Sequence, residues 1–147
     1  MARFNVAMLG DAELERRLLE LPEKVERTVI TRALRNASQA FAKAIKPDVP
    51  RSTPKRSRKT KTGKHMADTL KTRAMRRRKH RIGYRVFTGT RAELGIPSGK
   101  EYYPAVIEFG SKTIAPRAFI RGPFRVQKTD LRTRIVNELR EGLAKLG

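Results

Sequence analysis

Apolar residues recur at every third or fourth position along the first third of the chain. The recurring positions are Leu14, Leu18, Leu21, Val25, Val29, Ala33, Ala37, Phe41 and Ile45. This spacing places them on one face of a helical segment, and it is the clearest structural pattern in the sequence. Pro22 and Glu23 suit the first turn of a long helix, because the amide that proline lacks has no partner there. Since Pro47 cannot continue the helix, we expect it to end by Lys46.

Two strands are predicted in the middle of the chain. Residues 69–78 and 82–88 have the composition and alternation of strands. Residues 79–81 would join them as a tight hairpin. Lys71 and Arg73 fall on the same side of the first strand, so that side is strongly basic.

The spacing of apolar residues in the last part of the chain predicts another helix. Its apolar positions, four residues apart, are Leu131, Ile135, Leu139 and Leu143. The helix is expected to begin within residues 116–130, with Phe119, Ile120 and Phe124 anchoring its start in the core. The apolar segment Tyr102–Gly110 is too short for its period to distinguish helix from strand.

Together these elements predict the α+β class. We expect one domain over residues 1–147, in which the long N-terminal helical segment and the C-terminal helix pack on a small antiparallel sheet. Residues 47–64 contain almost no apolar side chain, so they are predicted to form a long, flexible basic loop or arm.

Composition excludes several classes of protein. With 38% hydrophobic and 33% charged residues, the chain is too apolar for a wholly disordered polycation and too charged for a membrane protein. The absence of Cys excludes disulfides and thiolate chemistry. The first residues lack the sustained apolar run of a secretion signal, which leads us to expect a protein that stays in the cytoplasm where it is made.

The net charge of +21 is concentrated in residues 51–81, which hold fourteen Lys and Arg and one acidic residue, Asp68. Clustered cations bind nucleic-acid phosphates through counterion release, although a charge run is often only a solvated surface. Residues 51–81 contain no Phe, Tyr or Trp, so stacking on bases is not supported. We interpret the segment as a contact for double-stranded DNA or an acidic partner. The candidate residues are Arg51, Lys55, Arg56, Arg58, Lys59, Lys61, Lys64, Arg73, Arg76, Arg77, Arg78 and Lys79.

Groups that would carry catalysis are scarce, so we expect no enzyme, no metal site and no cofactor. His65 and His80 lie among basic and polar residues without carboxylate neighbours, as surface histidines do. Glu108 lies between apolar and aromatic residues, where a buried, unpaired carboxylate would be costly. We therefore expect Glu108 to pair with an arginine or to cap backbone amides. A small hydrolase would require a metal or a pair of acids that the sequence does not indicate.

The segment from Tyr102 to Arg121 carries the most specific pattern. It reads Tyr102-Tyr103-Pro104-Ala105-Val106-Ile107-Glu108-Phe109-Gly110-Ser111 and then Ala115-Pro116-Arg117-Ala118-Phe119-Ile120-Arg121. This pattern resembles that of a family of tail components of tailed phages and prophages, which includes neck, tail-terminator and tail-completion proteins of long-tailed phages. The order of elements agrees over nearly the whole chain. The basic insert at residues 51–61 looks longer than is usual in the family.

The resemblance implies a non-enzymatic virion protein that forms a ring, commonly of six copies, at the head-tail junction or the top of the tail tube. Its neighbours would be the tail-tube protein and a connector or head-closure protein, after assembly in the host cytoplasm. Tail-terminator, tail-completion and head-closure roles stay open, as does the copy number. The motif residues assigned to the fold and to subunit contact are Tyr102, Tyr103, Glu108, Phe109, Gly110, Pro116, Phe119 and Arg121.

The alternative is a basic nucleic-acid-binding protein with a globular core and a polycationic arm, similar in composition to a ribosomal or nucleoid protein. Tight, steeply salt-dependent binding of duplex DNA or RNA by the monomer would favour this alternative. Weak binding combined with ring formation would favour the phage assembly role.

Overall fold

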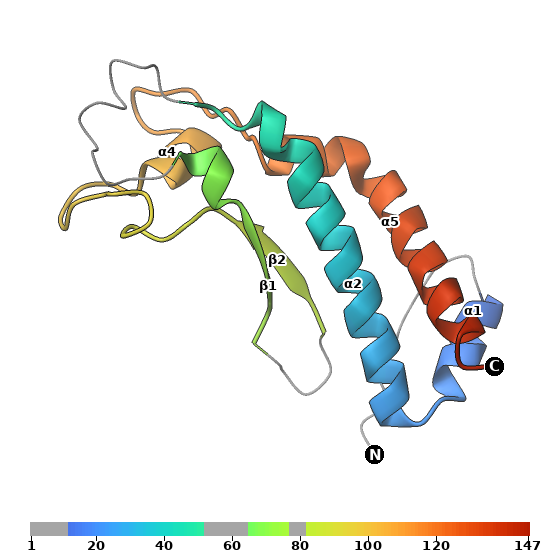
Figure 1. Cartoon of the computed structure of the whole chain (residues 1–147). Coiled ribbons are helices and arrows are strands. Elements are labelled where there is room, and N and C mark those ends of the chain that lie inside the picture. Colours follow the sequence, from blue (N-terminus) through green and yellow to red (C-terminus); the bar gives the residue numbers. More distant parts are fainter. Residues whose placement is uncertain (1–11, 52–64, 77–81) are drawn as a thin grey trace.

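The computed structural model describes residues 12–51, 65–76 and 82–147. Helices α2 and α5 lie side by side, and a two-stranded hairpin lies along the other side of α2 (Figure 1). This arrangement confirms the predicted α+β class. The elements in chain order are α1 (Ala12–Leu19), α2 (Glu23–Ile45), the 3-10 turns η1 (Lys46–Asp48) and η2 (Met66–Thr69), β1 (Lys71–Ala74), β2 (Tyr84–Phe87), α4 (Tyr103–Phe109) and α5 (Arg121–Ala144).

Helix α2 is the central element, and its apolar face is the one that the sequence predicted. Its buried apolar residues are Val29, Ala33, Ala37, Phe41, Ala42 and Ile45. The helix begins directly after Pro22 and ends at Ile45, two residues before Pro47, as expected. Gly142 of α5 faces α2 so closely that a Cβ built there would lie 2.8 Å from Val29 Cγ1. Small side chains therefore let the two long helices approach each other.

The buried side chains form two clusters. The first joins α1, α2 and the end of α5, and it contains Leu14, Leu18, Val29, Ala33, Leu139 and Leu143. The second lies around η2 and the segments that flank α4, and it contains Val49, Met66, Ala67, Leu94 and Phe119. Val49 is 2% exposed, so one residue near the start of the predicted basic loop 47–64 is packed in the core. Residues 52–64 of that prediction lie outside the described residues.

The strands pair antiparallel, but β1 is shorter than predicted. The register places Lys71 opposite Phe87 and Arg73 opposite Arg85. The prediction of a strand from residue 69 is wrong, because Thr69 belongs to η2. Its hydroxyl donates to the Met66 carbonyl at 2.9 Å and accepts from the Gly89 amide at 3.0 Å, which holds it in a turn. The predicted hairpin connection at 79–81 lies outside the described residues.

The segment that the sequence left undecided is helix α4, which has Pro104 in its first turn. It ends at Phe109 and is followed by Gly110, whose φ of 80° favours glycine. A Cβ at Gly110 would also lie 2.9 Å from the Ile114 carbonyl oxygen. Helix α5 begins at Arg121, within the predicted interval. Phe119 is 4% exposed as expected, whereas Phe124 is 48% exposed, so its predicted burial in the core is wrong.

Candidate functional site

Glu108, near the end of α4, joins α4 to the start of α5. Its side chain is 6% exposed. Oε2 accepts a hydrogen bond from the Ile120 amide at 2.9 Å, and Oε1 accepts one from the Arg121 amide at 2.9 Å. These amides lie at the N-terminus of α5, where backbone donors have no helical partner and a negative charge is favoured. Glu108 therefore caps the N-terminus of α5, the next helix along the chain.

The same carboxylate pairs with the side chain of Arg121. Arg121 Nε donates to Glu108 Oε1 at 3.1 Å, and Arg121 Nη2 donates to the Glu108 backbone carbonyl at 3.0 Å. The expectation that Glu108 would pair with an arginine or cap a backbone is confirmed, because it does both. The guanidinium also lies over the ring of Phe109, 4.4 Å from its centroid. We call Glu108, Phe109 and Arg121 the clasp.

The loop between α4 and α5 is folded back onto α4. The Arg117 amide donates to the Ile107 carbonyl at 2.8 Å, and the Gly122 amide donates to the Ala118 carbonyl at 2.7 Å. Ala118 has a φ of 41°, in the left-handed region that costs a non-glycine residue about 1–2 kcal/mol. The clasp and these backbone bonds hold this conformation, which fixes the direction in which α5 leaves the loop.

The other motif residues lie around the clasp. Tyr102 donates its hydroxyl hydrogen to the Gly89 carbonyl at 2.7 Å and contacts the Thr88 hydroxyl at 2.7 Å. Burial, with a smaller contribution from Tyr102, raises the pKa of the Tyr103 hydroxyl. Pro116 is exposed and lies against Gly110. The structure thus brings the motif together around the junction of α4 and α5.

Three of the twelve candidate basic residues lie in the part of the chain that the structure describes. Arg51 Nη2 lies 3.9 Å from Asp68 Oδ1, which also receives Lys46 Nζ at 3.5 Å. Arg73 and Arg76 are exposed on and after β1. The remaining candidates lie outside the described residues. They are Lys55, Arg56, Arg58, Lys59, Lys61, Lys64, Arg77, Arg78 and Lys79.

Arg85 is a further exposed cation of the hairpin, and it is absent from the candidate basic residues that the sequence indicated. It lies on β2 directly opposite Arg73, and both side chains are exposed. In an antiparallel pair, directly opposed residues share a face of the sheet. The alternation of residues 82–88 placed Arg85 away from the apolar face. Only the register of the hairpin, however, brings it beside Arg73.

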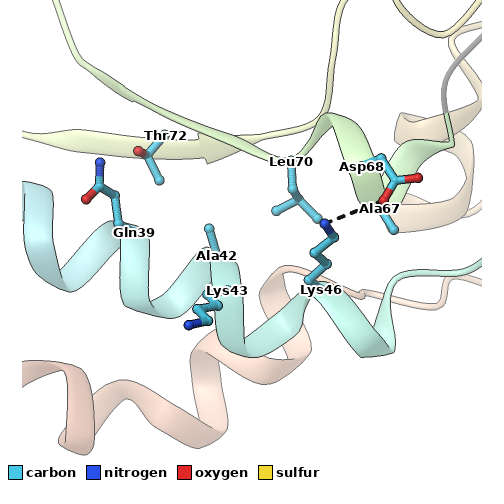
Figure 2. A pocket seen from close by; sticks show the side chains of 8 residues that line it. All are labelled: Gln39, Ala42, Lys43, Lys46, Ala67, Asp68, Leu70 and Thr72. Atoms are coloured by element: carbon cyan, nitrogen blue, oxygen red, sulfur yellow. Dashed lines mark ion pairs between the residues drawn. The ribbon is translucent and has the colours of Figure 1, made fainter.

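A small hollow of about 260 Å³ lies between α2 and the segment from η2 to β1. In Figure 2, Lys46 extends from the end of α2 toward Asp68, while Leu70 and Thr72 lie on the strand side. Asp68 is the acidic group of this hollow, and two cations neutralise it. Among the described residues, no group of three or more His, Cys, Asp or Glu is placed to hold a metal ion. No helix in that part of the chain is long and apolar enough to cross a bilayer.

A family model described as "Bacteriophage HK97-gp10, putative tail-component" matches residues 12–110. The chain belongs to this HK97-gp10-like family. The resemblance inferred from the motif is thereby confirmed, and it places the chain among the phage tail components and hence with the virion. The family match includes Glu108 and Phe109 and ends before Arg121, the third member of the clasp. No curated protein and no solved structure is a significant match to the chain.

Proposed function

We propose that this HK97-gp10-like chain is a non-enzymatic, ring-forming component of the phage neck or tail end. In this role it joins the tail tube to the head connector, as a neck, tail-terminator or tail-completion protein. Its neighbours are further copies of itself, the tail-tube protein and a connector or head-closure protein. It assembles in the host cytoplasm and stays in the virion.

The observation that supports assembly is a set of exposed apolar side chains on α4, on the loop that follows it and on the first two turns of α5. Phe109 is 62% exposed, Phe124 48% and Val126 84%, and Ile114 in the intervening loop is also exposed. Val126 is the most exposed of the large apolar side chains in the described part of the chain, and exposed apolar groups of this kind are candidates for an interaction site. We call Phe109, Ile114, Phe124 and Val126 the apolar surface.

Helix α5 contributes little of its first part to the core of the subunit. Its fully buried residues are Leu139 and Leu143, both in the second half of the helix. Phe124 is fixed by an edge-to-face contact with Phe41, with ring centroids 5.9 Å apart. The clasp holds the start of the helix rigidly. A ring needs two different surfaces on each copy that meet their neighbours, and a rigid helix with exposed apolar groups suits one of them.

Electron microscopy of intact particles carrying a labelled chain tests the proposal. The label is expected at the junction of head and tail as a ring of density. A chain found at the distal end of the tail, or as isolated copies along it, would contradict the proposal.

A pair of variants tests the apolar surface itself. Val126→Lys is expected to prevent ring formation and to leave heads and tails unjoined, because a lysine is costly to bury in an interface between subunits. The matched control is Asn137→Lys, which places the same side chain at another exposed position of α5. The oligomeric state follows from mass photometry, and the particles are counted by microscopy. Equal assembly of both variants would show that this part of α5 is not an interface.

A further inference from the structure

The outward face of the hairpin carries an unbalanced positive charge. The register places Lys71, Arg73, Arg85 and Phe87 on one face of the sheet. The other face, with Leu70 and Thr72, borders the hollow beside α2. The outward face is therefore directed away from the central helix.

Arg73 and Arg85 lie directly opposite each other on this face, although like charges in that position destabilise a strand pair. Lys71 on the same face forms an ion pair with Glu93, so its charge is balanced. Among the described residues, neither Arg73 nor Arg85 has a carboxylate partner. The repulsion between the two arginines weakens the hairpin in the free subunit. An anion that binds both arginines would offset this repulsion and stabilise the hairpin.

Arg85 lies beside an aromatic ring of the same strand. Its guanidinium lies 5.2 Å from the centroid of Phe87. Stacking leaves the edge of the guanidinium available, and that edge carries the donors that bind phosphate oxygens in pairs. The ring of Phe87 is covered in this way, so it is not presented for stacking on a base.

We propose that Arg73 and Arg85 bind the phosphate backbone of double-stranded DNA without regard to sequence. Two arginines opposed on one face of a sheet suit a polyanion of regular spacing, and Arg76 continues the positive charge beyond the strand. This site is distinct from the apolar surface, and it does not depend on ring formation.

The test measures binding of the full-length protein to a short fluorescent DNA duplex by anisotropy at several salt concentrations. The sheet variant is Arg73→Gln with Arg85→Gln. The control is Arg17→Gln with Lys24→Gln, which removes two positive charges from exposed positions on α1 and the first turn of α2. Each lost phosphate contact reduces the slope of log affinity against log salt by about 0.9, so the sheet variant should lose about 2 from the slope. Its affinity should fall by about tenfold or more, while the control keeps the wild-type slope.

Three outcomes would overturn the proposal. Equal losses in the two variants would mean that only the net charge matters. Unchanged DNA binding by the sheet variant would exclude the site, and if that variant also failed to assemble, the partner would be an acidic protein surface. A strong preference for one DNA sequence would exclude backbone recognition. A thermal melt accompanies each variant, and the sheet variant should melt no lower than the wild type because it relieves the repulsion between the arginines.

Discussion

Glu108 shows how one side chain can fix the relation between two helices. Its carboxylate accepts from two backbone amides and from the Arg121 side chain, while being almost fully buried. Water is excluded from the carboxylate, so a lost bond there is not replaced. The sequence predicted the need for such partners from the apolar neighbours of Glu108. It did not identify them as Ile120 and Arg121, because that pairing depends on how the intervening loop turns.

Glu108→Gln is expected to lower the free energy of unfolding by about 2–3 kcal/mol. The amide nitrogen of Gln would face a backbone amide that needs an acceptor, and the ion pair with Arg121 would be lost. The expected loss of unfolding free energy is smaller than for a fully buried ion pair, because the Arg121 side chain is 44% exposed. Urea unfolding measures the change, and Glu101→Gln is the control at an exposed site. Equal stability of the two variants would contradict the role given to the clasp.

Glu26 makes the stability of the fold depend on pH. It is 6% exposed on α2, and its Oε1 has no hydrogen-bond partner among the described residues. Burial and, to a smaller extent, the neighbouring Glu23 raise the pKa of the Glu26 carboxyl, against a lowering by Arg27. The folded chain therefore keeps this proton over a pH range in which the unfolded chain has released it. The contribution of Glu26 to stability is lost as the pH rises through its folded pKa.

Glu26→Gln should remove this dependence. At about pH 8 the variant should be more stable than the wild type by about 1 kcal/mol, while at about pH 4 the two should be nearly equal. Chemical unfolding at both pH values gives the difference, and Glu13→Gln on the exposed side of α1 is the control. A variant that is less stable than the wild type at about pH 8 would mean that the carboxylate makes a favourable contact there.

At the scale of elements, the long helices could be predicted and the short elements could not. The apolar residues of α2 recur over about six turns of helix, so one exception does not hide their spacing. Helix α4 has seven residues, too few for a period to show. The start of β1 depends on bonds of the Thr69 hydroxyl, and the anchoring of Val49 depends on a core formed by distant residues. The opposition of Arg73 and Arg85 depends on the hairpin register. These features arise from tertiary contacts, which composition and period do not encode.

The two ends of α5 should differ in how strongly they respond to the same substitution. Ala is favoured over Gly in a helix by about 1 kcal/mol. At Gly122 the nearest atom to a new Cβ outside the adjacent residues is Ala118 Cβ at 3.9 Å, but Pro123 follows, and a side chain before proline disfavours the helical backbone. The two effects oppose each other, so Gly122→Ala should change the stability of the fold by less than about 1 kcal/mol. At Gly142 the Cβ would lie 2.8 Å from Val29 Cγ1, and Gly142→Ala should destabilise it by about 1–2 kcal/mol. Thermal unfolding of the two variants provides the comparison. Equal stability of the Gly142→Ala variant and the wild type would mean that α2 and α5 can separate without cost.

At the scale of the whole molecule, the two proposed surfaces lie on different elements. The outward face with Arg73 and Arg85 belongs to the hairpin on one side of α2. The apolar surface belongs to α4, its loop and the start of α5 (Figure 1). A subunit built in this way can use one surface for its neighbours while the other stays available. Loss of assembly and loss of DNA binding should therefore be separable by mutation, with Val126→Lys affecting the first and the paired arginine variant the second.

Hydrogen exchange should locate the surface that assembly covers. In the free subunit, the amides of residues 121–131 should exchange faster than those of residues 33–41, because the first half of α5 has no fully buried side chain whereas α2 is packed along its length. On assembly, exchange at 121–131 should slow by about tenfold or more, with 33–41 unchanged. The Val126→Lys chain, mixed under the same conditions, should retain the rates of the free subunit. Protection confined to α1, or equal rates in free and assembled protein, would place the contact elsewhere and leave the exposed apolar residues of α5 without an assembly role.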